Sequence, residues 1–133
     1  MRLIFHNANE LAAKTKATVH SSGKLGFSIE TNKILELDQY KFMQIATNED
    51  DENDLNLYAI LHKDEIEGAF RLIKAGSYYN LNTKGLFDKL NVDYQNTTVI
   101  YDIVKSDYEG RQILKLLRRD IKKKTKAADK KAQ

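Results

Sequence analysis

The chain has 133 residues, of which 41% are hydrophobic, and this length and composition suit one small compact domain. It contains no Cys, which excludes a disulfide framework and a thiolate metal site and favours a cytoplasmic protein. No apolar run is long enough to cross a membrane, and we expect neither a secretion signal nor a membrane partner.

Positive charge is concentrated at the C-terminal end of the chain. The whole sequence carries a net charge of +3, but nine Lys or Arg and two Asp residues give residues 115–133 a charge of +7. The preceding 114 residues therefore sum to −4. We predict a compact domain over residues 1–119 and a basic tail over residues 120–133, which either reaches nucleic acid as an arm or is a solvated terminus.

In chain order, the first half alternates short strands with one short helix. Apolar alternation predicts strands over residues 2–6, 16–20 and 25–29. A helix over residues 30–37 follows, with a possible cap at Thr31. It is too short to be stable alone, so we expect Ile34 and Leu37 to be buried against the strands.

A hairpin with an acidic turn follows the first helix. Its strands are predicted over residues 41–47 and 55–62, and the turn over residues 48–54 carries five carboxylates. A calcium loop is one interpretation of this turn. The spacing lacks the Gly and the distal Glu of the helix-loop-helix calcium motif, so we predict a solvated, mobile hairpin tip.

The second half shows a similar order of elements. Strands are predicted over residues 68–74 and 77–81, and a helix of about two turns begins at Asn82 or Thr83. The inward face of this helix is predicted to consist of Leu86, Phe87 and Leu90. A last hairpin joins residues 97–104 to residues 111–117, although residues 113–121 also fit helical spacing.

This order predicts an α+β fold, mainly of antiparallel strands, in two ββαββ repeats with short helices. The repeats span about residues 16–63 and 69–118, and an offset of 53 aligns Gly23 with Gly76. Chance agreement between two strand-helix-strand pieces is the alternative. A homodimer formed through exchanged or paired hairpins is compatible with this arrangement.

Residues that would indicate catalysis are scattered. His6, His20 and His62 lie on separate predicted strands without metal-ligand spacing, and no glycine-rich phosphate-binding motif is present. We predict a protein that is not an enzyme and that holds neither a metal nor another cofactor.

One segment resembles a known family. Residues 17–28, ATVHSSGKLGFS, precede a predicted short helix and the LELD run of residues 35–38. This pattern resembles the swapped-hairpin DNA-binding family of AbrB and MazE, although Ser28 stands where that family usually has Pro. Two such units in one chain are similar to the MraZ arrangement. The resemblance covers about residues 16–63 and, more loosely, residues 70–117.

The resemblance implies a non-catalytic transcriptional regulator that binds DNA. It places six basic residues toward phosphates: Lys14, Lys16 and Lys24 from the first unit, and Arg71, Lys74 and Lys84 from the second. Phosphate contacts of this kind fix the register of a protein on DNA and depend on salt.

Two other interpretations stay open. Arg71, Lys74, Tyr78 and Tyr79 could form a sheet surface for single-stranded DNA, in an element order that resembles the PC4, Whirly and PUR families. Alternation along a strand would turn one of the two tyrosines into the core. The protein could instead be a protein-protein interaction module, antitoxin-like or virion-associated. The basic residues expected of a nucleic-acid arm are Arg118, Arg119, Lys122, Lys123 and Lys124.

Overall fold

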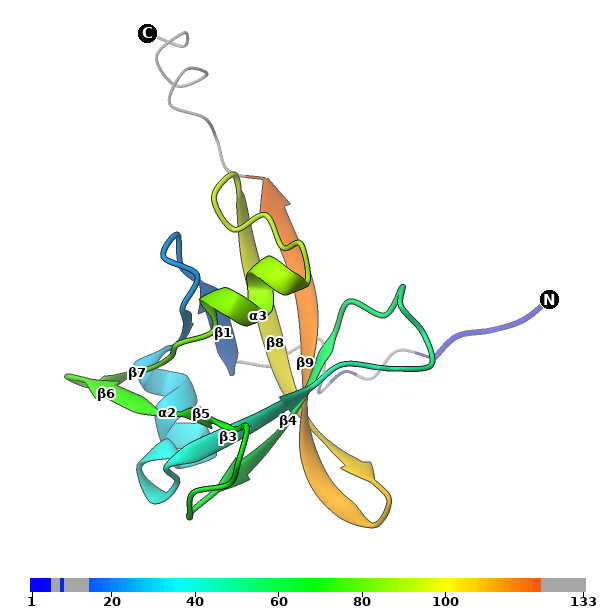
Figure 1. Ribbon diagram of the computed structural model, residues 1–133. Coiled ribbons are helices and arrows are strands. Elements are labelled where there is room, and N and C mark those ends of the chain that lie inside the picture. The colour runs from blue at the N-terminus through cyan, green and yellow to red at the C-terminus, as the bar shows by residue number, and fades with distance from the viewer. Residues whose placement is uncertain (6–7, 9–14, 123–133) are drawn as a thin grey trace, which may run out of the picture.

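The computed structural model describes residues 1–5, 8 and 15–122, and it is dominated by antiparallel strands (Figure 1). The first six elements are β1 (Lys16–Val19), β2 (Leu25–Phe27), α2 (Ile29–Leu35), the 3-10 turn η1 (Leu37–Gln39), β3 (Phe42–Ala46) and β4 (Leu57–His62). The others are β5 (Phe70–Arg71), β6 (Ile73–Ala75), β7 (Tyr78–Leu81), α3 (Lys84–Lys89), β8 (Thr97–Tyr108) and β9 (Arg111–Lys122).

The nine strands of the described residues belong to one sheet, in the order β5-β3-β4-β9-β8-β1-β2-β7-β6. The two outermost strands, β5 and β6, are consecutive in the chain and are separated only by Leu72. β5 pairs with β3, and the Leu72 N–H continues this contact by donating to the Lys41 carbonyl at 2.8 Å, whereas β6 pairs with β7. One short stretch of chain therefore joins both edges, and the sheet is nearly closed and barrel-like.

The prediction of an α+β fold built from two ββαββ repeats is wrong. Strands from the two halves of the chain alternate within the single sheet, because β1 pairs with β8, β2 pairs with β7 and β4 pairs with β9. The helices α2 and α3 have only seven and six residues, too few to form a layer of their own. Four short strands and such a helix bury little apolar surface alone, so the strands of each half are covered by those of the other.

The core lies inside the curved sheet. Leu25 points inward from β2, and Val99 and Tyr101 point inward from β8. All three side chains are fully buried. From α3, Phe87 enters the same core and stacks on Tyr101, with a distance of 6.2 Å between the ring centroids. This stacking fixes α3 against the middle of β8.

The buried face of α2 differs from the predicted one. Leu37 is buried as expected, but Ile34 is 49% exposed and Leu35 is buried instead. The helix begins earlier than predicted, because Ser28 is the cap and its hydroxyl accepts a hydrogen bond from the Thr31 N–H. Thr31 itself is buried, and its hydroxyl bonds to the backbone of Lys16.

Both ends of the chain also depart from expectation. Residues 2–5 do not form the predicted strand, and residue 6 lies outside the described residues. β8 and β9 have twelve residues each, so residues 113–121 are strand rather than helix, and residues 120–122 belong to the sheet rather than to a tail. Within the described part of the chain, neither helix is long and apolar enough to span a membrane.

Candidate nucleic-acid interface

The turn between β1 and β2 is joined to the start of α3 through Thr83. Thr83 is fully buried, and its hydroxyl donates to the Gly23 carbonyl and accepts from the Leu25 N–H, both at 2.9 Å. Gly23 has a φ of +86°, and a Cβ at this position would lie 2.8 Å from the Lys84 Cβ. The absence of a side chain at Gly23 therefore lets the two backbones meet, with Lys84 packed against Gly23, the residue before Lys24.

Lys24 and Lys84 are both exposed, but Lys84 already has an anionic partner. Its Nζ lies 2.6 Å from Asp88 Oδ2, and Asp88 Oδ1 accepts a hydrogen bond from the Tyr94 hydroxyl at 2.6 Å. The hydrogen bond with Asp88 raises the pKa of Lys84, and the same bond lowers the pKa of Asp88. At neutral pH this cluster therefore holds a lysine cation next to a fixed carboxylate.

A second cluster of similar composition lies on the hairpin of β6 and β7. Lys74 Nζ lies 3.7 Å from Asp38 Oδ1, and the Tyr79 hydroxyl donates to the same oxygen at 2.5 Å. Tyr79 is buried beside Phe27, its register partner on β2, whereas Tyr78 is 53% exposed. Of the two neighbouring tyrosines, only Tyr78 can stack on a base from this surface.

The remaining predicted residues do not form one arm. Lys16 is exposed and pairs in register with Asp102, which forms an ion pair with Arg119 at 2.5 Å. Arg118 and Arg119 are consecutive in β9, and Arg118 pairs with Asp120 at 2.8 Å. Their charges are therefore largely compensated within the sheet. Two further predicted residues, Arg71 in β5 and Lys122 at the end of β9, are exposed, while Lys14, Lys123 and Lys124 lie outside the described residues.

Charge is segregated along the body of the protein. Residues 15–41 and 69–90 contain eight Lys or Arg and four Asp or Glu, whereas residues 42–68 contain one Lys and eight Asp or Glu. Figure 1 places the β1–β2 turn, α2 and the β6–β7 hairpin on the left and the acidic β3–β4 loop on the right. We call the surface of the β1–β2 turn, α2, α3 and β5–β7 the basic face.

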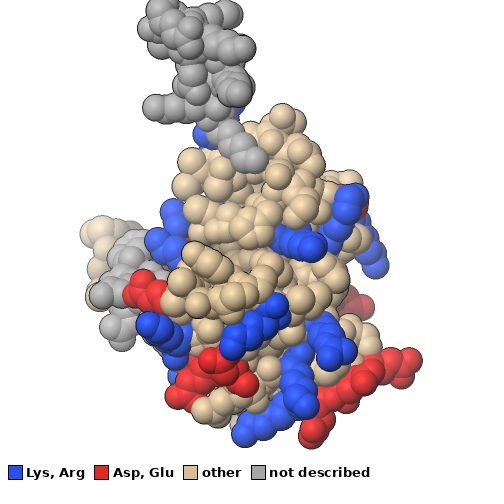
Figure 2. All heavy atoms as spheres, turned by 90° about the vertical axis from the view of Figure 1, so that its left-hand side faces the viewer, with Lys and Arg blue, Asp and Glu red and all other residues tan. Residues whose placement is uncertain are grey.

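Figure 2 shows the molecule from the side of the β6–β7 hairpin. Lys and Arg side chains are spread over the middle of this view, and Asp and Glu side chains gather toward its lower and outer parts. A chain whose first 114 residues have a negative net charge therefore still presents a surface on which cations predominate.

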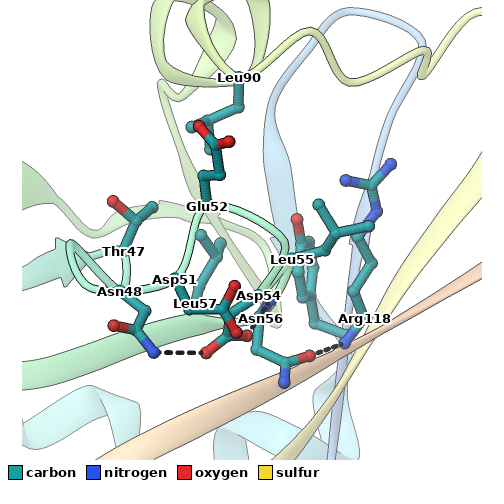
Figure 3. Close-up of a pocket in the computed structure, with 11 residues that line it drawn as sticks. Thr47, Asn48, Asp51, Glu52, Asp54, Leu55, Asn56, Leu57, Leu90 and Arg118 are labelled. Atoms are coloured by element: carbon teal, nitrogen blue, oxygen red, sulfur yellow. Dashed lines mark hydrogen bonds between the residues drawn. The ribbon is translucent and has the colours of Figure 1, made fainter.

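A cavity of about 240 Å³ lies under the acidic β3–β4 loop, next to the C-terminal end of α3 (Figure 3). Its lining combines Asp51, Glu52 and Asp54 of the loop with Leu90, Tyr101 and Arg118 of the body. If the protein bound a small ligand rather than nucleic acid, this cavity would be the candidate site.

Two carboxylates of this loop, those of Asp51 and Asp54, accept local hydrogen bonds. Asp54 accepts hydrogen bonds from Tyr58 at 2.5 Å and from Asn48 at 3.1 Å, and the Asn56 side chain accepts from the Arg118 N–H. The bond from Tyr58 lowers the pKa of Asp54, and it raises the pKa of Tyr58 to about 12. Among the described residues, no three His, Asp or Glu side chains converge as a metal site would require.

Sequence reasoning did not identify Asp38, Asp88 or Tyr94 as parts of this surface. The spacing of Lys84 and Asp88, four residues apart on a predicted helix, was a local signal for one ion pair. Asp38 and Tyr79 are 41 residues apart and have no such signal. Compared with protein-family models, curated proteins and solved structures, the chain has no match of any of the three kinds.

Proposed function

We propose that this protein is a non-catalytic DNA-binding protein that contacts the phosphate backbone through its basic face. The observation that carries the proposal is the junction of the β1–β2 turn with α3, where Thr83 bonds to Gly23 and each of these residues is followed in the chain by an exposed lysine, Lys84 and Lys24. Exposed cations on a rigid scaffold suit phosphate contacts, which supply most of the sequence-independent affinity of proteins for DNA.

A role in transcriptional regulation of the AbrB and MazE type extends this proposal. The resemblance over residues 16–63 assigns Lys24 to a phosphate contact, and Lys24 is exposed on the basic face, next to Gly23, which packs against Lys84. The concentration of five carboxylates in the β3–β4 loop adds support, because this loop lies on the other side of the molecule from the β1–β2 turn and the β6–β7 hairpin (Figure 1).

Binding of single-stranded DNA is the second candidate function, and Tyr78 is the observation in its favour. Its exposed ring lies one residue from Tyr79, the register partner of Lys74. Single-strand binders stack successive bases on several aromatic rings, however, and the β6–β7 hairpin offers one exposed tyrosine. Double-stranded DNA is therefore the favoured ligand.

The proposal is tested with fluorescence anisotropy on a labelled duplex and on a single strand of the same length. The variant Lys24→Ala/Lys84→Ala is compared with Lys63→Ala/Lys105→Ala, which changes net charge equally at exposed lysines elsewhere. We expect only the first variant to weaken duplex binding, and to reduce the slope of log affinity against log salt by about 2. Equal affinities for the two variants would remove the basic face from consideration and favour the protein-interaction alternative.

A further inference from the structure

Each of the two clusters on the basic face holds a lysine against a carboxylate that a tyrosine hydroxyl also binds. In one cluster the residues are Lys84, Asp88 and Tyr94, and in the other they are Lys74, Asp38 and Tyr79. The two lysines are among those expected to contact phosphate. Each of these lysines therefore lies next to a carboxylate that would limit its contact with phosphate.

The cluster at Asp88 is the tighter of the two. Both oxygens of the Asp88 carboxylate are engaged, Oδ2 by the Lys84 ammonium and Oδ1 by the Tyr94 hydroxyl, at 2.6 Å each. Tyr94 is buried, so its hydroxyl gives the exposed Asp88 a fixed partner in the body of the protein. The carboxylate cannot turn away from Lys84 without losing this second bond.

A phosphate that approaches Lys84 meets this carboxylate in two ways. It competes with Asp88 for the N–H donors of one ammonium group, and the negative charge of Asp88 repels it. We propose that Asp88 determines the affinity of the basic face for a phosphodiester backbone, as an intramolecular competitor for Lys84. This inference rests on the proposed function, and it names Asp88 as the residue that limits the affinity for DNA.

The second cluster provides an internal comparison. Lys74 and Asp38 are 3.7 Å apart, more than 1 Å farther than Lys84 and Asp88, so their ion pair competes less strongly with phosphate. Removing the charge of Asp38 is therefore expected to raise affinity by a smaller factor than removing the charge of Asp88.

The test measures duplex affinity by anisotropy for the full-length chain and for Asp88→Asn. Asn keeps the shape of Asp and an oxygen that can accept the Tyr94 hydrogen bond. Asp107→Asn, at an exposed position in the β8–β9 hairpin, is the control with the same change in net charge. We expect Asp88→Asn to tighten binding by about threefold to tenfold at low salt, and Asp107→Asn by less than about twofold.

A double-mutant cycle separates competition from a structural effect. In the background of Lys84→Ala, Asp88→Asn is expected to tighten binding by a smaller factor than in the wild type, because the competition for Lys84 is gone and only the charge repulsion is relieved. The same gain in both backgrounds would contradict the inference, and so would equal affinities of Asp88→Asn and Asp107→Asn. If the Asp88 inference fails but Lys24→Ala/Lys84→Ala still weakens binding, the proposed function stands. If the wild-type chain binds no DNA, both proposals fail together.

Discussion

Thr83 bonds to Gly23 across 60 residues of sequence, and this contact between two small residues positions the candidate interface. The Thr83 hydroxyl donates to the Gly23 carbonyl and accepts the N–H of Leu25, so one side chain satisfies two backbone groups of the β1–β2 turn. Because α3 starts at the next residue, the hydroxyl also fixes where Lys84 lies.

Replacing Thr83 by Val is expected to destabilise the fold by about 1–3 kcal/mol, because buried backbone groups lose their partner while the side-chain volume is kept. Chemical denaturation of Thr83→Val and of the half-buried Thr98→Val measures the difference. Equal free energies of unfolding for the two variants would show that the Thr83 hydroxyl does not hold α3 in place.

Substitutions at Gly23 and Gly76, which both have positive φ, distinguish the cost of backbone strain from the cost of close packing. Gly76→Ala adds a methyl group into open space at a φ of +65°, so its cost is the left-handed backbone alone, about 1–2 kcal/mol. Gly23→Ala meets similar strain and a contact of 2.8 Å with Lys84, so a larger loss of stability is expected. Thermal unfolding of both variants checks the order, and a Gly76→Ala protein that is the less stable of the two would contradict it.

The corrected face of α2 predicts unequal effects for two aliphatic residues. Leu37→Ala should cost about 2–5 kcal/mol because Leu37 is fully buried. Ile34→Ala should cost less than about 1 kcal/mol because Ile34 is 49% exposed. Urea denaturation of both variants is the measurement. A large loss in Ile34→Ala would support the helix face predicted from sequence periodicity over the one in the structure.

Stability is expected to fall at alkaline pH because Tyr101 is buried. Burial raises the pKa of Tyr101 to about 12, above the ordinary value of 10.0. The folded state therefore binds this proton more tightly than the unfolded state does. The resulting stability is complete below pH 10 and is lost as pH rises toward 12, by an amount on the order of 2 kcal/mol.

Thermal unfolding of the wild type and of Tyr101→Phe between pH 8 and pH 12 tests this dependence. Tyr101→Phe keeps the ring stacked on Phe87 but has no ionisable hydroxyl, so its stability should fall less over this range. Tyr58, whose pKa is also about 12, contributes equally to both proteins. Parallel pH profiles would contradict the role of Tyr101.

Local patterns predicted most of the strands but not how the strands pair. Alternation located β1, β3 and β4 within a few residues, because side chains on the two faces of each strand have different environments. The pairing of β1 with β8 and of β4 with β9 depends on contacts between residues far apart in the sequence. No local pattern reports such contacts, and the two similar halves suggested separate repeats.

The candidate site was predictable to a similar degree. Alternation required one of Tyr78 and Tyr79 to face the core, and the structure shows that it is Tyr79. The contact of the β1–β2 turn with the start of α3 depends on a hydrogen bond across 60 residues, and the partnership of Lys74 with Asp38 depends on the placement of η1. The partner of a lysine can be predicted where it lies four residues away on the same helix, as Asp88 does, but not where it is distant in sequence, as Asp38 is from Lys74.

The most direct test of the account is an anisotropy titration of labelled duplex and single-stranded DNA, at two salt concentrations, with the full-length protein and with a chain ending at Lys122. Residue 122 is the last residue of β9, so this truncation leaves the described sheet complete while it removes five lysines of the basic tail. The account predicts that the shortened chain still binds duplex DNA, more tightly than single strands and with a clear salt dependence. Loss of all binding on truncation would contradict it, because the basic face would then contribute no affinity of its own.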